Sequence, residues 1–339
     1  MRAIWITKYG GPEVLEIREQ PDPLPGAGEV RIRVRACGLN FAELMAREGL
    51  YPDAPKPPCV VGYELAGEVD ALGAGVREPR EGARVVAVTR FGAHADTVCV
   101  PAEQTRVMPD GMSFEEGAAI PVVYLTAHHM LFRVAHLRQG ARVLVHMAAG
   151  GVGLAAIQLA RTVEDVVIFG TASAAKHAFL REYGCDHCID YRKIDYAAEV
   201  RRLTGGAGVD LVLDPLGGKD WQKGYDLLAP AGMLVAFGFA NMAAGEKRKL
   251  LHVARHYLSV PKFSPMTLMD DNRAVAGVNA GHLWRESTML GRDLDALLVL
   301  YRAGKIKPTI DSVFKFSDVA AAHRRMHERR NVGKLVLVP

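Results

Sequence analysis

The chain has 339 residues, of which 49% are hydrophobic and 24% charged, and its formal net charge is +4. This length suits a globular protein of two domains, and the low charge, without a Lys/Arg run interleaved with aromatic residues, excludes a typical nucleic-acid-binding protein. No apolar stretch is long enough for an integral membrane segment, and five cysteines without a secretory leader predict free thiols in the reducing cytoplasm.

Residues 1–121 have the pattern of a small β-rich domain. From Glu29 to Ala36, Val and Ile alternate with Arg, which is typical of a strand with one buried and one solvated face. Proline-rich turns occupy 21–26 and 52–58. We expect further strands at 65–72, 84–89 and 97–101, and a short helix at 41–48. Many short strands between Pro/Gly-rich turns predict a β-barrel.

The segment 142–162 predicts a dinucleotide-binding turn. An apolar run, Val143–Met147, is typical of a buried strand, and a small-residue turn and an unbroken helical pattern follow it. Glycine lets backbone N–H groups approach a pyrophosphate, and a helix N-terminus attracts the negative charge. Ala148 stands where the first glycine of G-x-G-x-x-G belongs, so the pattern by itself also fits a simple tight turn. We expect His146, inside the strand, to be a packed core residue.

Three later strands favour the nucleotide interpretation. Apolar runs at 166–170, 210–214 and 233–238 are separated by helix-length segments, so we expect residues 122–282 to form a doubly wound parallel sheet. Ligands bind beyond the carboxyl ends of such strands. The cofactor-binding candidates are therefore Ala149, Gly150, Gly151, Val152 and Gly153 in the turn, Pro215 and Leu216 after the run at 210–214, and Phe237, Gly238 and Phe239 around the end of the last run.

The end of the second strand indicates which dinucleotide binds. NAD-specific folds usually carry Asp or Glu there to bind the ribose 2′-hydroxyl. No acidic residue occurs from Val166 to Arg181. Ser173 and Lys176 can donate to a 2′-phosphate, which an acidic residue would repel, although Lys176 alone also fits a solvated helix lysine. We therefore predict NADPH, with Thr171, Ser173 and Lys176 as binding candidates.

Residues 283–339 combine two helical patterns, at 294–301 and 316–330, with a final apolar run at 334–338. A terminal strand left alone would present an unpaired edge. We therefore expect this strand to return to the sheet of the first domain.

Motifs throughout the chain resemble those of one known superfamily. Ala36–Phe41, Gly62–Glu64 and the turn at 149–153 are similar to medium-chain dehydrogenase/reductases, above all to the quinone oxidoreductase branch. Further segments resemble the VAT-1 group: 169–173, 189–191, 214–218, 272–275, 306–313 and 331–334. The resemblance implies an α/β protein with a GroES-like β-barrel catalytic domain and a Rossmann NADPH-binding domain, which assembles as a homodimer.

The resemblance also implies site residues. It places Asn40 and Thr126 beside the nicotinamide and adds Tyr191 and Arg329 to the nucleotide contacts. It makes Tyr51 the best choice of proton donor. Two of these residues have plainer alternatives, because Thr126 also fits a hydroxyl bonded to its own helix and Tyr51 a tyrosine that anchors its loop.

The same resemblance argues against a metal. In alcohol dehydrogenase relatives a Cys and a His bind catalytic zinc, and these positions fall at Asn40 and Tyr63, which are not zinc ligands. We interpret the nearby Glu43 and Glu64 as structural or orienting groups. Cys185–Cys188 is a C-x-x-C without a second pair, and we interpret it as core thiols.

Without zinc, no Lewis acid polarises a simple carbonyl, so the hydride acceptor must already be activated. We expect NADPH to reduce a quinone, an enone or a 2-enoyl thioester such as an enoyl-CoA. Met45 stands where quinone-reducing relatives often carry a tyrosine, which argues against a quinone. The alternative is a VAT-1-like nucleotide-binding adaptor at lipid or vesicle surfaces with little turnover, but the sequence shows no basic amphipathic helix with a large apolar face.

Overall fold

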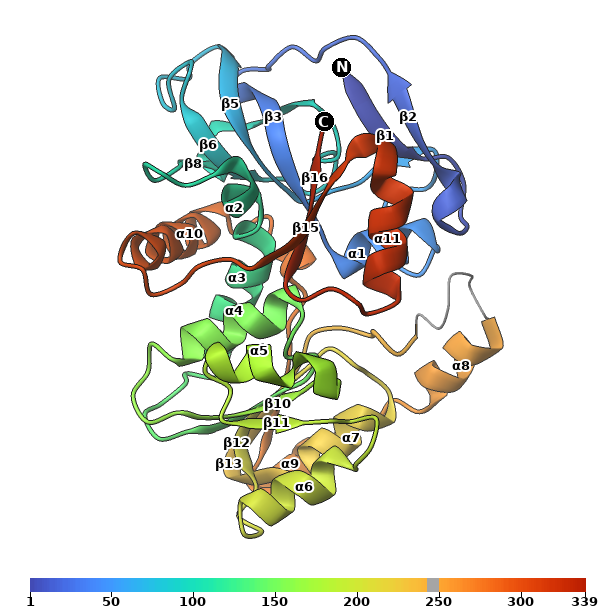
Figure 1. The fold of residues 1–339 in the computed structure, drawn as a ribbon, viewed down its shortest axis with the longest axis vertical. Helices are drawn as coiled ribbons and strands as arrows, with labels where there is room; N and C mark the ends of the chain where they lie inside the picture. Colours follow the sequence, from blue (N-terminus) through green and yellow to red (C-terminus); the bar gives the residue numbers. More distant parts are fainter. Residues whose placement is uncertain (243–249) are drawn as a thin grey trace. The chain divides into compact units, whose positions relative to one another are not determined.

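The computed structural model describes residues 1–242 and 250–339 (Figure 1). These residues divide into two compact units. One unit contains residues 1–125 together with 280–339, and the other contains the described residues from 126 to 279. In the described part of the chain, no helix combines the length and the apolarity that crossing a membrane requires.

The first unit, the barrel unit, is built on two sheets whose pairings are antiparallel, except that β15 and β16 are parallel. The larger sheet has the order β15-β16-β3-β5-β6-β8, and β7 also pairs with β3. A smaller sheet has the order β2-β1-β4. The strands are β1 (Arg2–Ile6), β2 (Leu15–Glu19), β3 (Glu29–Leu39), β4 (Cys59–Val60), β5 (Glu64–Leu72), β6 (Arg84–Val88), β7 (Thr97–Pro101), β8 (Thr105–Val107), β15 (Ile310–Lys315) and β16 (Lys334–Val338).

Strand β3 explains why this sheet forms. Val30, Ile32 and Val34 are buried, whereas the intervening arginines pair with acidic side chains of β5. Asp70 accepts from both Arg31 and Arg33, at 2.8 and 2.6 Å. One face of the strand therefore builds the core, and the other forms cross-strand ion pairs.

The terminal strand β16 lies antiparallel to β3, with Val336 opposite Gly38, which confirms the predicted return to the first sheet. The predicted helix at 316–330 is shorter than expected. A single 3-10 turn, η6 (Phe316–Asp318), precedes α11 (Val319–His327), and Arg329 has a positive φ of 56°. A residue with left-handed backbone just beyond a helix is a common way to end it.

The other helical elements of the barrel unit are short, apart from α10. They are η1 (Pro12–Val14), α1 (Phe41–Arg47), η2 (Ala102–Gln104), α2 (Phe114–Ala118), η5 (Ala280–His282) and α10 (Ser287–Arg302). The segment that leads from one unit to the other is helical, with α3 (Pro121–His128) followed by one π-helical stretch, η3 (His129–Val134).

The second unit, the dinucleotide unit, has a six-stranded sheet of order β11-β10-β9-β12-β13-β14, in which every pairing is parallel. The strands are β9 (Arg142–Val145), β10 (Val167–Thr171), β11 (His187–Ile189), β12 (Val209–Asp214), β13 (Leu228–Ala236) and β14 (Ala274–Gly277). This is the doubly wound sheet that the sequence predicts.

The direction of the connections divides the helices between the two faces of this sheet. The chain first moves outward from β9 to β11 and then restarts at β12 on the other side of β9, so right-handed crossovers place the two sets of helices on opposite faces. Figure 1 shows α4 and α5 on one face and α6, α7 and α9 on the other. The helices are α4 (Gly151–Ala160), η4 (Ala174–Lys176), α5 (His177–Glu182), α6 (Tyr196–Leu203), α7 (Lys219–Tyr225), α8 (Leu250–Leu258) and α9 (Pro265–Asp271).

Candidate functional site

The turn between β9 and α4 has the form of an anion site. Strand β9 ends at Val145, so His146 and Met147 belong to the turn and not, as predicted, to the strand. Met147 has a positive φ of 51° and accepts a hydrogen bond of 2.8 Å from the Gly150 N–H. Gly150 then begins α4 without a side-chain cap, so the first N–H groups of this ten-residue helix remain available to a phosphate.

Close packing explains which glycines this turn requires. A Cβ on Gly153 would lie 2.5 Å from the Ala148 carbonyl oxygen and 2.6 Å from that of Met147. A Cβ on Gly150 would meet only the Met147 oxygen, at 3.2 Å. Ala148 is tolerated at the first motif position because it faces Gly170 of β10, whose missing side chain leaves room for it.

The turn lies where the strand order reverses, beside the end of β12. There Asp214 is buried, and its Oδ1 accepts from the N–H groups of Leu216 and Gly217, at 2.5 and 3.3 Å. Its Oδ2 has no partner among the described residues, and burial raises the pKa of Asp214 to about 7. Asp214 therefore holds the Pro215–Gly217 turn in place, a role that the sequence analysis did not recognise.

Candidates from the two neighbouring strand ends lie together. Asp214 of β12 is in register with Ala236 of β13, so the loops that follow run side by side. The Ala240 N–H donates to the Pro215 oxygen at 2.8 Å. Phe239, which is largely exposed, packs on Trp221 with ring centroids 4.8 Å apart.

The 2′-phosphate candidates gather at the ends of β10 and β11, where Thr171 pairs with Ile189. Ser173 precedes η4, Lys176 ends it, and Tyr191 follows β11 with an exposed ring. Thr171 itself is turned inward. Its Oγ1 accepts from the Met147 N–H at 3.3 Å and lies 3.1 Å from His146 Nδ1, so Thr171 orients the turn.

In the barrel unit, three distant segments of the chain form a buried polar cluster of Asn40, Glu43, Glu64 and Lys334. The Asn40 side chain donates to Glu64 at 3.0 Å and to Glu43 at 3.3 Å. Lys334 Nζ donates to Asn40 Oδ1 and to the Glu64 carboxylate. The second oxygen of Glu64 accepts from the Val122 N–H at 2.7 Å. No member of the cluster is more than 9% exposed.

The charges of this cluster nearly cancel. Burial raises the pKa of Glu43 to about 8, although the Lys334 ammonium opposes this shift. Burial also lowers the pKa of the adjacent His94 to about 4, so that His94 is neutral at pH 7. Lys334 is not among the site residues that the sequence predicts. The available signal was a single lysine at the start of an otherwise apolar strand.

Tyr51 and Tyr63 belong to an aromatic cluster in the barrel unit. Tyr63 is 5% exposed, and its ring centroid lies 5.4 Å from that of Phe91 and 6.4 Å from those of Tyr51 and Trp284. Burial, reinforced by the Glu43 carboxylate and by Tyr51, raises the pKa of Tyr63. Tyr63 Oη has no hydrogen-bond partner in the described part of the chain. Burial, reinforced by Asp53, raises the pKa of Tyr51, so its hydroxyl keeps its proton at neutral pH.

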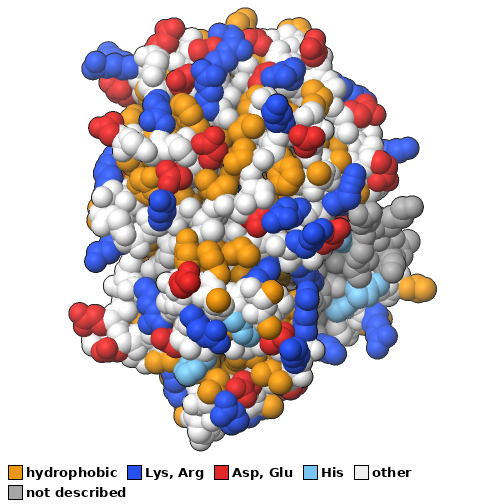
Figure 2. Space-filling model, viewed as in Figure 1, with side chains coloured by type: hydrophobic (Ala, Val, Ile, Leu, Met, Phe, Trp, Pro, Cys, Tyr) orange, Lys and Arg blue, Asp and Glu red, His pale blue; other side chains and the backbone are white. Residues whose placement is uncertain are grey.

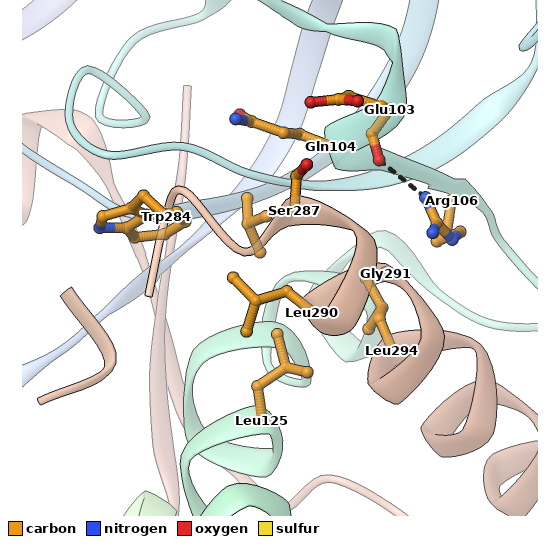
Figure 3. Close-up of a pocket in the computed structure, with 10 residues that line it drawn as sticks. Glu103, Gln104, Arg106, Leu125, Trp284, Ser287, Leu290, Gly291 and Leu294 are labelled. Atoms are coloured by element: carbon orange, nitrogen blue, oxygen red, sulfur yellow. Dashed lines mark hydrogen bonds between the residues drawn. The ribbon is translucent and has the colours of Figure 1, made fainter. Parts of the chain in front are cut away.

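The cavity drawn in Figure 3 lies beside Trp284 and is enclosed mainly by Leu125, Leu290 and Leu294. Its volume of about 10 Å³ is enough for a single water molecule and not for a substrate. Arg106 closes its polar end by donating to the Glu103 carbonyl at 2.8 Å.

The two remaining predicted residues belong to other elements. Thr126 lies within α3 and is 8% exposed, and Arg329 follows α11. Among the described residues there is no group of three His, Cys, Asp or Glu side chains arranged to hold a metal ion.

Comparisons with known proteins show what the chain is similar to. The alcohol dehydrogenase GroES-like domain model matches residues 26–135, and the zinc-binding dehydrogenase model matches residues 183–337. The rat synaptic vesicle membrane protein VAT-1 homolog is 48% identical over 100% of this chain and 84% of its own length. Two solved structures are also similar. The Escherichia coli quinone oxidoreductase complexed with NADPH has a TM-score of 0.87 at 29% identity and covers 100% of both chains, and the CurK enoyl reductase has a TM-score of 0.85 at 28% identity and covers 99% of this chain and 98% of its own.

Proposed function

Because the chain belongs to the medium-chain dehydrogenase/reductase superfamily, within its VAT-1 group, we propose that it is a zinc-independent reductase that uses NADPH to reduce a conjugated carbonyl compound. The acceptor class comprises quinones, enones and 2-enoyl thioesters. The observation that carries the proposal is the N-terminus of α4, which has no side-chain cap and whose first turn contains Gly153, where a Cβ would overlap two carbonyl oxygens of the turn. In addition, no acidic residue occurs between β10 and Arg181.

The residues of the dinucleotide unit fit NADPH. The N–H groups of Gly151 to Gly153 would bind the pyrophosphate, because they lie at the positive end of α4. Ser173, Lys176 and Tyr191 would receive the 2′-phosphate at the ends of β10 and β11. Once bound, NADPH supplies the hydride.

Two groups in the barrel unit would serve the acceptor. Tyr51 holds a proton at neutral pH and would give it to the oxygen or the α-carbon of the reduced acceptor. Asn40 occupies a position that binds zinc in alcohol dehydrogenase relatives. In this chain the buried ammonium of Lys334 supplies the positive charge beside Asn40, and its hydrogen bond to Asn40 Oδ1 fixes the orientation of the amide.

The proposal is tested by following NADPH oxidation with a panel of quinones, enones and enoyl-CoA thioesters, with NADPH and NADH affinities measured by calorimetry. We expect turnover with at least one class, and an affinity for NADPH at least about tenfold above that for NADH, equivalent to about 1.4 kcal/mol. Tighter binding of NADH would contradict the assignment.

Substitution of Tyr51 tests the proton donor. Tyr51→Phe removes the hydroxyl and keeps the ring in the aromatic cluster. We expect kcat to fall by about 10²–10⁴-fold, the usual contribution of a general acid, while the Kd for NADPH stays unchanged. Tyr9→Phe, at an exposed tyrosine of the same unit, is the matched control. An unchanged kcat would assign Tyr51 to anchoring its loop.

A second candidate, a nucleotide-binding adaptor at lipid surfaces, is favoured by α8. Leu251, Tyr257 and Leu258 are 89%, 71% and 84% exposed, and residues 250–269 contain no acidic residue. Figure 2 shows apolar and histidine side chains at the edge of the face where α8 lies. This exposed apolar surface is not predictable from the sequence, because an apolar run does not reveal whether another element covers it.

Sedimentation with vesicles separates the two candidates. An adaptor should bind phosphatidylserine-containing vesicles, lose this binding in Leu251→Glu/Leu258→Glu, and bind NADPH without turning over any acceptor. Turnover combined with an absence of vesicle binding would exclude the adaptor.

A further inference from the structure

The C-x-x-C sequence at the start of β11 plays no part in the proposed reaction. Cys185 is buried in the loop after α5, and Cys188 is half-buried within β11. Both are free thiols in the structure. Paired cysteines at this spacing in a protein of the reducing cytoplasm are either inert core residues or a redox pair, and their surroundings distinguish the two.

The strand register brings the two thiols to one place. Phe169 and His187 are partners across β10 and β11, and their rings stack on one face with centroids 4.8 Å apart. Because side chains alternate along a strand, the next pair, Gly170 and Cys188, must face the opposite side. On that side, a Cβ on Gly170 would lie 2.7 Å from Cys185 Sγ. Cys185 and Cys188 therefore share the space that Gly170 leaves open.

The same space adjoins the dinucleotide-binding turn. The Cβ built on Gly170 would also lie 3.0 Å from the Cβ of Ala148 in that turn. On the other side, Cys188 Sγ lies 3.7 Å from the carbonyl oxygen of His177, the residue that follows Lys176. The two thiols are thus packed between the pyrophosphate turn and the 2′-phosphate segment.

The two thiols differ in the way that a redox pair requires. Cys188 is partly accessible, and its interaction with Cys185 lowers its pKa, which favours the reactive thiolate. Cys185 is 3% exposed, and its pKa is raised by the interaction with Cys188 and by burial. Cys188 is therefore the thiol that would attack an oxidant, and Cys185 is placed to attack the oxidised Cys188 and form a disulfide.

We propose that Cys185 and Cys188 form a redox-active dithiol that hydroperoxides oxidise to a disulfide, and that this disulfide weakens NADPH binding. The second half rests on the proposed function. The Cys188 thiolate attacks the terminal peroxide oxygen, the O–O bond breaks, and the alkoxide or hydroxide that leaves takes up a proton. The Cys185 sulfur then attacks the resulting sulfenic acid, and water leaves. In sum, two thiols and one hydroperoxide give one disulfide, one water and one alcohol, or a second water from hydrogen peroxide.

Packing explains the coupling to NADPH. A disulfide holds its sulfurs about 2.05 Å apart, closer than two packed thiols. Drawing them together must move β11 or the loop before it relative to Gly170, and Ala148 of the turn borders the same space, because a Cβ built on Gly170 would lie 3.0 Å from the Ala148 Cβ. The dinucleotide turn and the segment after β10 then no longer bind the pyrophosphate and the 2′-phosphate at the same time.

The test treats the purified full-length protein with hydrogen peroxide, alkylates the remaining thiols, and analyses the peptides by mass spectrometry. We expect a disulfide between Cys185 and Cys188, reversed by dithiothreitol, and a Kd for NADPH raised about fivefold or more by the disulfide. Cys185→Ser and Cys188→Ser should each abolish both effects. Cys99→Ser, at a half-buried thiol of the barrel unit, is the control that should retain them.

Three outcomes would overturn the proposal. The first is irreversible oxidation of Cys188 while Cys185 remains a free thiol that can be alkylated. The second is a disulfide that leaves the Kd for NADPH unchanged. The third is NADPH binding that is as sensitive to peroxide in the serine variants as in the wild type. If the reduced protein does not bind NADPH, the proposed function and the coupling both fail. The existence of the dithiol is then decided by the peptide masses alone.

Discussion

The dinucleotide turn and the Asn40–Lys334 cluster are two candidate functional regions built in opposite ways. The turn is made of backbone groups within one short segment, and its decisive feature is the absence of a side chain at Gly153. The cluster is made of buried polar and charged side chains from three distant segments, and each depends on the others. The turn therefore tolerates little added volume, whereas the cluster tolerates little loss of charge.

The largest effect should come from removing the charge of Lys334. Lys334→Met leaves the Glu64 carboxylate buried without its cation, so we expect the free energy of unfolding to fall by about 3–5 kcal/mol. Urea denaturation measures this. Adding Glu64→Gln to the first substitution removes the uncompensated charge and should restore part of the loss. If the double variant is no more stable than Lys334→Met, the cluster is not held together by charge.

Adding a methyl group should damage the turn by a different mechanism, steric overlap, and at a smaller cost. In Gly153→Ala the new Cβ overlaps two carbonyl oxygens, so α4 must shift, at a cost of about 1–3 kcal/mol. We expect NADPH affinity to fall with it. Gly150→Ala is the matched control, because its Cβ has a nearest neighbour at 3.2 Å and its φ of −81° suits alanine. Equal losses in both variants, measured by calorimetry, would refute the packing argument.

An acidic residue after β10 should change which dinucleotide is preferred. Ser173→Asp brings a carboxylate to the predicted 2′-phosphate position, so we expect the ratio of NADPH affinity to NADH affinity to fall about tenfold, or about 1.4 kcal/mol. Ser173→Ala should change the ratio less. An unchanged ratio in Ser173→Asp would place the 2′-phosphate elsewhere.

The smallest effect, measured between pH 7 and 8, is the dependence of stability on pH that Glu43 of the cluster contributes. Glu43 binds its proton more tightly in the folded protein, with a pKa of about 8 against 4.5 when exposed. The unfolded chain therefore holds fewer protons between these values, so stability falls as pH rises towards 8, by at most about 1.4 kcal/mol per pH unit.

The pH prediction is checked above pH 7, where the contribution of His94, with a lowered pKa of about 4, has reached its full value. Urea denaturation of wild type and Glu43→Gln should show a steeper decline in the wild type. Glu68→Gln, at an exposed partner of Arg35, should decline like the wild type. Parallel curves for wild type and Glu43→Gln would mean that Glu43 is ionised throughout.

The amino-acid sequence alone determined the local features of this protein. The strand, glycine turn and helix around Gly150–Gly153, and the absence of an acidic residue after β10, depend on neighbours along the chain. The alternation of Val and Ile with Arg in β3 predicted its buried face for the same reason. The local errors were small, such as placing His146 inside β9, because strand ends depend on single residues such as Met147 with its positive φ.

Only the tertiary structure decided which distant residues meet. Lys334 reaches Asn40 and Glu64 because β16 pairs with β3, and the register of that pairing is not encoded in either strand by itself. Cys185 and Cys188 converge over Gly170 for the same reason, because Gly170 and Cys188 are partners across β10 and β11. Trp284, which lies outside the strands, stacks on Tyr63 through tertiary packing. A side chain's partners across a sheet depend on register, which the whole core establishes, whereas a turn is established by its own backbone.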